Sequence, residues 1–282
     1  MVKNKLYTLN CNQRLLTISS PIIMGIINAT PDSFYNKGKN SSIDEMIANA
    51  KQMMNEGATI LDIGGMSSRP GAAIISEQEE MDRVLPIIEA IKKEMPTIFL
   101  SIDTYRSPVA EECIKAGIDI INDISGAELD AEIIDIAAKY QTPYICMHMQ
   151  GTPQTMQQNP SYENVTNEVY QFLYNKIQLL KSKNVVDVIS DVGFGFGKTT
   201  AHNFELLKNL EVFQQLNTPT LVGISRKSMI YKTLNSTPEN ALNGTTALNM
   251  IALQNGAAIL RVHDVKEAKE CIALWGKINN NS

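Results

Sequence analysis

Eight apolar runs alternate with helical segments along the chain, and this alternation constrains the fold more than any other feature. Each run has the length and the β-branched character of a buried strand. The runs cover residues 21–30, 58–65, 97–104, 118–125, 142–149, 185–193, 218–225 and 257–264. Continuous apolar strands joined by helices predict a parallel sheet that is buried on both faces. Without a Pro/Gly/Ser-rich linker, the pattern predicts one (β/α)8 TIM barrel, a single domain over residues 1–282.

Short motifs predict where helices begin in two of the connecting segments. Ser42 with Glu45, and Ser76 with Glu79, have the Ser-x-x-Glu spacing of a capping box. In this motif the serine side chain accepts a hydrogen bond from a free backbone N–H of the first helical turn. Helices are therefore expected to start beside Ser42 and Ser76.

Glycine marks three joints between a helix and the following strand, at Gly57, Gly117 and Gly256. Glycine adopts the left-handed conformation that ends a helix without steric cost, so these joints support the predicted alternation. Ahead of the first barrel strand, residues 5–20 have the pattern of a short hairpin that turns at residues 11–13. We expect this hairpin to close one end of the barrel.

Charge and cysteine usage exclude several classes of protein. A net charge of -5 argues against a nucleic-acid partner, which would require a basic surface. No segment reaches the roughly 20 apolar residues of a membrane span, and a reducing cytoplasm fits the composition. The cysteines lack C-x-x-C spacing and are expected to be buried free thiols: Cys11, Cys113, Cys146 and Cys271. His148 is interpreted as a residue at the edge of the core, and His202 as one in a helix N-terminus.

Polar side chains interrupt the apolar runs near their C-terminal ends, which is where TIM barrels carry their active sites. These residues are Asn28, Asp103, Asn122, Asp191, Ser225, Arg226, Lys227, Arg261 and His263. A single one could be a capping or loop residue. Burying all of them at one barrel mouth costs several kcal/mol unless a polar ligand satisfies them, so together they predict a binding pocket.

The chemistry of these residues divides into two sets. Carboxylates, an amide and a cation suit a flat heterocycle with donors and acceptors on its edge; this set is Asp103, Asn122, Asp191 and Lys227. A forked cation and a second donor, directly before a predicted helix, suit phosphate; this set is Arg261 and His263. The pocket is thus expected to hold a heterocycle that carries a phosphate group.

The stretch SDVGFGFGKT at residues 190–199 raises the separate possibility of a phosphate loop. The Walker pattern requires glycine where Val192 stands, and the dinucleotide fingerprint fails because Gly197 comes one residue early. We interpret the glycines as an open turn after the sixth strand. Lys198 and Thr199 are then expected to be ordinary helix-entry residues.

Eight ordered segments of the chain closely resemble those of the dihydropteroate synthase family. They are MGIINATPDSF, GGMSSRPG, SIDTYRSPV, INDIS, MHMQGTPQTMQ, GFGFGK, GISRKS and RVHDV, between residues 24 and 265. The resemblance implies an enzyme of folate biosynthesis. Such enzymes join p-aminobenzoate to 6-hydroxymethyl-7,8-dihydropterin pyrophosphate and release pyrophosphate, and sulfonamides compete with p-aminobenzoate.

The resemblance also implies a role for each matching residue. The pterin site would comprise Asp103, Asn122, Asp191, Lys227, Met147 and Gly223. The pyrophosphate site would comprise Asn28, Arg261 and His263, with Asn28 also contacting Mg2+. The p-aminobenzoate site would comprise Ser68, Arg69, Pro70, Phe196 and Ser225. The catalytic residues would be Asp103, Lys227, Arg261 and Asn28, and the family is usually dimeric.

The family mechanism breaks the C–O bond to pyrophosphate first, and the arylamine then attacks a pterin methylene cation. Some residues depart from the family pattern. Val192 stands where proline is usual, and Met66 and Ser68 stand where Glu or Gln and Thr are common. Asn36 stands where the family commonly has an aspartate close to the reacting centre. This last change puts the rate of the reaction in question more than its nature.

Three other functions stay open at this point. The Asn36 substitution is compatible with a pterin-binding protein of weak activity, and the barrel type with a pterin-dependent methyltransferase. Neither would need the anion set of Arg261 and His263, so the synthase interpretation is favoured. A barrel aldolase or isomerase for sugar phosphates is a further alternative, but no strand-end lysine sits alone in the apolar setting that Schiff-base chemistry favours.

Overall fold

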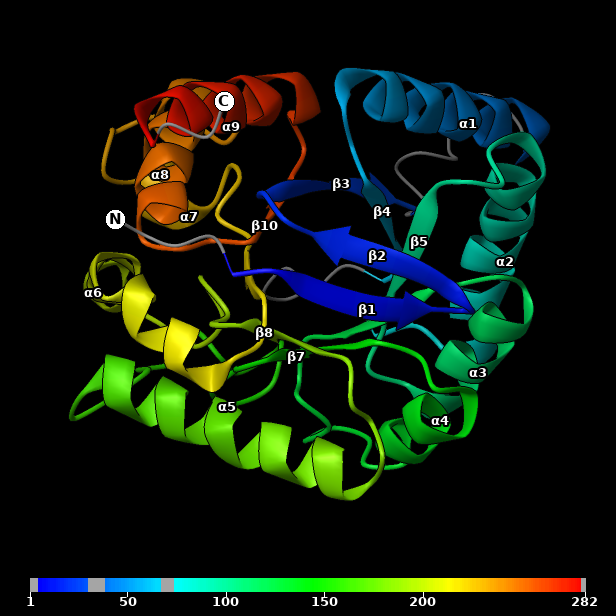
Figure 1. The fold of residues 1–282 in the computed structure, drawn as a ribbon, viewed down its shortest axis with the longest axis horizontal. Coiled ribbons are helices and arrows are strands. Elements are labelled where there is room, and N and C mark those ends of the chain that lie inside the picture. Colours follow the sequence, from blue (N-terminus) through cyan, green and yellow to red (C-terminus); the bar gives the residue numbers. More distant parts are fainter. Residues whose placement is uncertain (1–4, 30–38, 67–73, 280–282) are drawn as a thin grey trace.

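The computed structural model describes residues 5–29, 39–66 and 74–279 (Figure 1). Its centre is a closed barrel of parallel strands in the order β10-β3-β4-β5-β6-β7-β8-β9. Each strand therefore pairs with the strands that come before and after it in sequence, and β10 closes the ring on β3. The predicted TIM barrel is confirmed.

Each of the eight apolar runs contains one barrel strand. The strands are β3 (Ile22–Asn28), β4 (Ile60–Gly64), β5 (Phe99–Asp103), β6 (Ile120–Asp123), β7 (Tyr144–Met147), β8 (Val188–Asp191), β9 (Thr220–Val222) and β10 (Ile259–Val262). The helices are α1 (Lys39–Glu56), α2 (Glu77–Glu94), α3 (Ser107–Lys115), α4 (Ile133–Tyr140), α5 (Val165–Ser182), α6 (Thr200–Lys208), the 3-10 helix η2 (Leu210–Leu216), α7 (Ser228–Tyr231), α8 (Leu242–Gln254) and α9 (Val265–Ile278).

The two predicted helix starts have different outcomes. Ser76 is the N-cap of α2, and its hydroxyl accepts a hydrogen bond from the backbone N–H of Glu79 at 3.1 Å. In a full capping box, the Glu79 carboxylate would accept from the backbone N–H of Ser76. Here it accepts from Arg83 instead, at 2.6 Å. The predicted start beside Ser42 is wrong, since α1 already begins at Lys39. No proline or glycine stands between these positions to stop the helix from extending.

The three glycines at helix-to-strand joints all have the predicted positive φ. The angle is 112° at Gly57, 112° at Gly117 and 94° at Gly256. A side chain at Gly256 would also place its Cβ 2.1 Å from the Gln214 amide. These joints can therefore return the chain tightly from each helix into the barrel.

The N-terminal hairpin closes one end of the barrel, as predicted. It consists of β1 (Tyr7–Cys11) and β2 (Arg14–Ile18), which pair antiparallel and lie across the near end in Figure 1. One apolar cluster joins the hairpin to side chains from the barrel strands; its buried members are Leu9, Cys11, Leu16, Ile18, Met24, Ile60, Ile120, Ile145, Ile189, Leu221 and Ile259. The barrel interior is therefore sealed from solvent at its N-terminal end.

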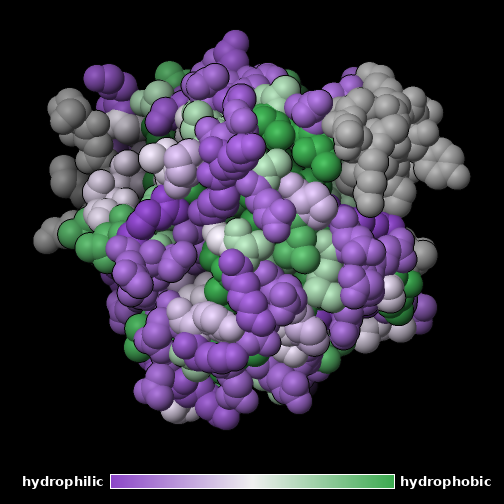
Figure 2. Space-filling model, turned by 90° about the vertical axis from the view of Figure 1, so that its right-hand side faces the viewer, coloured by the Kyte–Doolittle hydropathy of each residue, from purple (hydrophilic) through white to green (hydrophobic). Residues whose placement is uncertain are grey.

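A second, larger core fills the space between the barrel and the helices around it. The outer face of α2, α3 and α4 is largely hydrophilic (Figure 2), as expected for amphipathic helices with one face on the barrel. The four cysteines are buried free thiols, which confirms their interpretation. Within the described ranges, no helix is long and apolar enough to cross a membrane.

The hairpin offers a direct test of this seal. Leu16 is 3% exposed in the apolar cluster beneath the hairpin, whereas its neighbour Leu15 is 69% exposed. We expect Leu16→Ala to lower the free energy of unfolding by about 2 to 5 kcal/mol, because it leaves a cavity in the apolar cluster. Leu15→Ala should change it by less than about 0.5 kcal/mol. Urea denaturation of both variants measures the difference, and equal losses would contradict the seal.

Candidate active site

The barrel interior changes from apolar to charged in one step along the strands. Side chains two residues apart on a strand point to the same side, so residues two positions after the apolar layer form the next interior layer. That layer includes Asp62, Asn122, Met147, Asp191, Gly223 and Arg261, with Asp103 at the end of β5. The structure thus brings the two predicted sets together at the C-terminal mouth.

Arg261 is the centre of this layer. Its Nε donates to Asp62 Oδ2 at 2.6 Å, and its Nη2 donates to Asp103 Oδ2 at 2.7 Å. Nη2 also lies 2.6 Å from Asp62 Oδ2. Asn122 Nδ2 donates to the same Asp62 oxygen at 3.0 Å. Arg261, predicted for the anion set, therefore lies in direct contact with a carboxylate predicted for the heterocycle set.

Asp62 was not among the residues predicted from the sequence. It is fully buried, and its second oxygen, Oδ1, has no hydrogen-bond partner among the described residues. A signal for it was present, because Asp62 interrupts the run ILDIG two residues after Ile60, as Asp191 does two residues after Ile189. A search for polar residues at a constant register, and not only at strand ends, would have found it.

Burial changes the acidity of the carboxyl groups in this layer. It raises the pKa of Asp103 to about 7, while the adjacent Arg261 guanidinium acts in the opposite direction. Burial likewise raises the pKa of Asp191, and the Lys227 ammonium opposes this shift. The Asp191 side chain also accepts from the backbone N–H of Gly193 at 2.7 Å. This bond fixes its position at the start of the turn that contains Gly193, Gly195 and Gly197, called the glycine turn below.

Lys227 connects β9 to the glycine turn. Its ammonium donates to the backbone carbonyl of Phe194 and lies 4.7 Å from the centre of the Phe196 ring. Burial lowers the pKa of Lys227 to about 8, and Asp191 opposes the shift. Gly223 lies beside this lysine, and a Cβ added there would be in ordinary contact with Arg261 at 3.8 Å and with the Lys227 ammonium at 3.9 Å.

An apolar surface lies beside the charged layer. Its buried members are Ile124, Met147, Met149 and Met156, and the partly buried Tyr105, Leu129 and Phe196 pack against them. Met147 and Phe196, which were predicted to line different parts of the pocket, thus belong to one cluster. A flat ring can pack on such a surface while its edge faces the polar side chains.

Ser225 and His263 were predicted for different ligands but contact each other. The Ser225 hydroxyl accepts from the His263 backbone N–H at 3.2 Å and lies 3.0 Å from Nδ1 of the ring. When the hydroxyl donates its proton to Nδ1, Nε2 carries the ring N–H and can donate it to a ligand. Burial and the nearby Arg261 lower the pKa of His263, which favours this neutral ring.

Arg226 has a structural role at the same edge. Its guanidinium makes a two-pronged ion pair with Asp264, at 2.9 Å from Nε and 2.6 Å from Nη2. Its backbone is left-handed, with φ of 55°. This pair joins the turn after β9 to the start of α9 and leaves Arg226 engaged away from the charged layer.

The remaining residues named from the sequence have different positions. Asn28 ends β3 and pairs in register with Gly64, next to the strand that ends in Asp103. Val192 is fully buried behind Asp191. Ser68, Arg69, Pro70 and Asn36 lie outside the described residues.

The interpretation of Lys198 as an ordinary helix-entry residue is wrong. Lys198 is 3% exposed, and its ammonium lies 2.9 Å from His148 Nδ1. It also donates to the backbone carbonyls of Gly193 at 2.9 Å, Phe196 at 3.0 Å and His148 at 3.2 Å. The lysine points back into the glycine turn because four acceptors surround the ammonium there, and solvent offers no comparable set.

The glycine turn packs directly on the segment after β7. A Cβ at Gly193 would lie 1.9 Å from the His148 carbonyl oxygen, and one at Gly197 would lie 2.4 Å from that of Gln150. His148 is buried there, as interpreted. His202, by contrast, completes a capping box with Thr199 at the start of α6, which confirms its assignment to a helix N-terminus.

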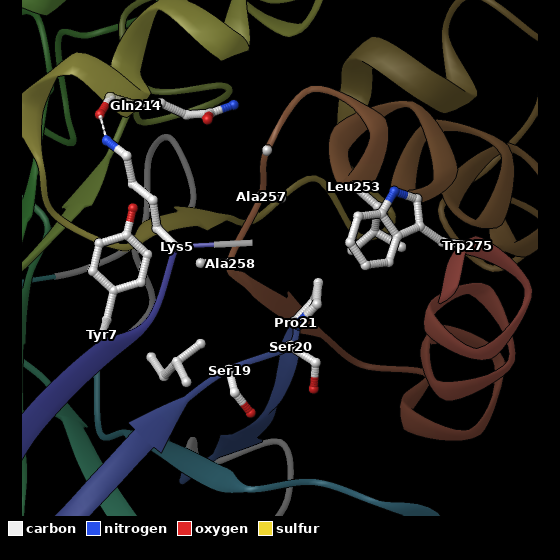
Figure 3. Close-up of a pocket in the computed structure, with 12 residues that line it drawn as sticks. Lys5, Tyr7, Ser19, Ser20, Pro21, Gln214, Leu253, Ala257, Ala258 and Trp275 are labelled. Carbon is white, nitrogen blue, oxygen red and sulfur yellow. Dashed lines mark hydrogen bonds between the residues drawn. The ribbon is translucent and has the colours of Figure 1, made fainter. Parts of the chain in front are cut away.

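A hollow at the opposite end of the barrel has a different character. It lies between the hairpin, η2 and α9, and Lys5, Tyr7, Gln214 and Trp275 are among its lining residues (Figure 3). The Lys5 ammonium is already engaged, since it donates to the Gln214 carbonyl at 2.7 Å and to Asn217 Oδ1 at 2.9 Å. The charged layer at the other end is the stronger candidate for chemistry.

Comparison with known proteins agrees with this geometry. The family model described as pterin binding enzyme matches residues 24–263. The dihydropteroate synthase of Haemophilus influenzae is 43% identical over 273 residues, which cover 96% of this chain and 98% of that protein. The chain belongs to the dihydropteroate synthase family. The matched region begins within β3 and ends at His263, so it includes residues from every barrel strand.

Solved structures of the family share the fold closely. A dihydropteroate synthase of Yersinia pestis, solved with a sulfonamide drug, aligns with a TM-score of 0.91 at 39% identity and covers 97% of this chain and 100% of that one. That of Xanthomonas albilineans, in complex with 7,8-dihydropteroate, aligns with a TM-score of 0.86 at 33% identity and covers 97% and 99%. The barrel with its N-terminal hairpin is thus the family architecture.

Lys198 provides a test of how the glycine turn is held. We expect Lys198→Met to lower the free energy of unfolding by about 1 to 3 kcal/mol, because the His148 ring nitrogen and the backbone carbonyls lose their shared donor. The matched control is Lys208→Met at the exposed end of α6, which should change it by less than about 0.5 kcal/mol. Chemical denaturation gives both values. A neutral Lys198→Met variant would show that the ammonium is not needed to hold the turn.

Proposed function

We propose that this protein condenses 6-hydroxymethyl-7,8-dihydropterin pyrophosphate with p-aminobenzoate to give 7,8-dihydropteroate and pyrophosphate. One observation carries the proposal: carboxylates, an amide and two cations converge at one barrel mouth beside an apolar surface. The residues are Asp103, Asn122, Asp191, Lys227 and Arg261. The relatives named above support the same reaction, and one of them was solved with 7,8-dihydropteroate.

The pterin ring fits the charged layer and the apolar surface beside it. Its ring N–H and amino groups require acceptors, which the Asp103 and Asp191 carboxylates supply. Its carbonyl oxygen requires a donor, which Lys227 and Asn122 supply. Met147 and Phe196 offer apolar contacts to the face of the ring. Gly223 matches the family position that lines this site, where a larger side chain would approach Lys227 and Arg261.

The pyrophosphate group fits the outer side of the same layer. Arg261 offers a forked cation, His263 offers its Nε2–H, and α9 begins at Val265 with its positive dipole end facing the mouth. In the family, Asn28 lies in this part of the site. A substrate placed in this way would span the barrel mouth, with its ring on the Asp191 side and its leaving group on the His263 side.

The side-chain chemistry also fits Mg2+ bound together with the substrate. Among the described residues, no group of three or more His, Cys, Asp or Glu side chains could hold a metal ion. Mg2+ commonly keeps several waters and binds through few protein oxygens plus substrate phosphates. Asn28 would supply the protein oxygen, and the ion would neutralise negative charge on the leaving pyrophosphate.

The proposed reaction begins with cleavage of the C–O bond between the pterin methylene and pyrophosphate. The bonding electrons leave with pyrophosphate, where Arg261 and His263 bind the growing negative charge. The pterin methylene cation that results lies among the carboxylates of Asp103 and Asp191, which stabilise it. The lone pair of the neutral p-aminobenzoate amine then attacks this carbon and forms the C–N bond, and the proton released from the nitrogen passes to solvent.

The arylamine would approach from the outer edge of the mouth. Phe196 and Ser225 border the pterin position from the turn after β8 and from the end of the β9 segment. In the family, Ser68, Arg69 and Pro70 complete this site. Sulfonamides, which resemble p-aminobenzoate, should compete there. We also propose that the protein works as a homodimer in the cytoplasm, as one pterin-binding barrel domain.

The decisive experiment mixes the purified protein with the pterin pyrophosphate, p-aminobenzoate and Mg2+. We expect dihydropteroate and pyrophosphate to form in equal amounts, because one C–O bond breaks for each C–N bond made. Binding of pterin without either product would instead identify a pterin-binding protein. A sulfonamide should inhibit, and inhibition should be relieved by added p-aminobenzoate.

The acidity of Lys227 predicts how the reaction depends on pH. Burial lowers the pKa of this lysine to about 8, so its positive charge is lost as the pH rises through that value. The value of kcat/KM for the pterin substrate should therefore fall above pH 8, because the ring carbonyl loses its charged donor. Lys227→Arg keeps its charge at higher pH and should move this decline upward by at least about one pH unit. An unchanged decline in the arginine variant would assign it to another group.

A further inference from the structure

Asp62 and Asp103 bind the same guanidinium from different depths. Asp62 is completely buried in the middle of β4, and one of its oxygens accepts from Arg261 and from Asn122. Asp103 ends β5 at the mouth, and its side chain is 17% exposed in the ion pair with Arg261. Arg261 therefore has an inner contact that solvent and ligands do not reach, and an outer contact that they do.

The outer contact, between Arg261 and Asp103, uses groups that a ligand would need. Nη2 of Arg261 lies 2.7 Å from Asp103 Oδ2 and 2.6 Å from Asp62 Oδ2, so this amino group faces two carboxylates and is not free for an anion. The Asp103 oxygen that accepts from Nη2 is likewise not free for an N–H of a ring. The inner contact has no such conflict, because Asp62 also accepts from Nε, which is not shared with Asp103. A guanidinium carries five N–H donors in a rigid fork, so it can keep one partner while it exchanges another.

We propose that Asp62 is a positioning residue that tethers Arg261 while its outer amino group exchanges between Asp103 and the diphosphate of the substrate. The same oxygen of Asp62 orients Asn122 toward the ring site. The exchange couples the two halves of the substrate: as the diphosphate takes Nη2, the Asp103 carboxylate becomes free to accept from the ring. This inference rests on the proposed function, which supplies the diphosphate.

Two other roles for Asp62 make different predictions. If Asp62 acted only through its negative charge, its removal would strengthen binding of an anion nearby, because a like charge disappears. If Asp62 had only a structural role, its removal would weaken the binding of every ligand to a similar degree. A tether predicts a selective loss of anion affinity, since Arg261 without its inner partner would turn fully to Asp103.

The experiment measures binding of inorganic pyrophosphate with Mg2+, and of p-aminobenzoate in its presence, by calorimetry on folded protein. We expect Asp62→Ala to weaken the binding of pyrophosphate about tenfold or more, which corresponds to about 1.4 kcal/mol of binding free energy. Asp62→Asn keeps an oxygen that can accept from Arg261, so this variant should lose less pyrophosphate affinity. Affinity for p-aminobenzoate should change less than threefold in both. Tighter pyrophosphate binding in either variant, or equal losses for both ligands, would overturn the tether.

A second carboxylate at the far end of the barrel provides the matched control. Asp119 is buried and binds both Lys92 and Arg14, at 2.6 Å and 2.9 Å, beneath the hairpin. Asp119→Asn removes a comparable buried charge and should lower stability without changing pyrophosphate affinity. A loss of affinity in this variant equal to that of Asp62→Ala would show that general destabilisation is sufficient.

The exchange itself is tested by a double substitution. Asp103→Asn removes the competitor for Nη2, so this variant should bind pyrophosphate as tightly as the unmodified protein or more tightly. Combined with Asp62→Ala, it should restore at least half of the lost binding free energy; no recovery would overturn the exchange. Product formation by the unmodified protein tests the proposed function separately. If that protein is active but the pyrophosphate affinities of the variants differ from those expected, only the tether is contradicted.

Discussion

A closed barrel of parallel strands imposes one constraint on which the rest of this molecule depends. Every second side chain of each strand points into the same narrow interior, so the strands share layers whatever their sequences. In this chain one layer is apolar and is sealed by the hairpin, whereas the next is charged. The polar layer can exist because it opens at the C-terminal mouth, where a ligand can complete its hydrogen bonds.

The charged layer is held by mutual compensation among its members. Three carboxylates, Asp62, Asp103 and Asp191, face two cations, Arg261 and Lys227. Buried ion pairs of this kind rarely increase stability over an apolar interior, because desolvation offsets most of the attraction. Their value here is chemical, since an excess of carboxylates matches the positive charge that develops on a pterin when its leaving group departs.

Much of the fold and of the site could be predicted because the signals were local. Apolar runs gave the strands, glycine at positions such as 57 and 117 gave the joints, and polar residues at strand ends gave the mouth. The start of α1 was misplaced because a capping motif describes only one turn, while the chain before it could also be helical. Helix boundaries depend on such small differences.

Two contacts that were not predicted join distant segments. The register of Asp62 in its apolar run marks it as an interior polar residue, but its pairing with Arg261, 199 positions later in the chain, cannot be read from that register. Lys198 looked like a surface residue because lysine usually is one, but the glycine turn places four acceptors around its ammonium. Neither arrangement can be inferred from residue type and spacing alone, since both require that the barrel has already closed.

The hairpin that seals the barrel has a consequence for the order in which the chain can fold. β1 and β2 precede every barrel strand, yet their apolar side chains pack on a layer that includes Ile259 of β10. During synthesis from the N-terminus, Leu9 and Leu16 therefore find their full set of neighbours only after the last strand has left the ribosome. Until then this apolar face is exposed to solvent, although the hairpin is made before every barrel strand.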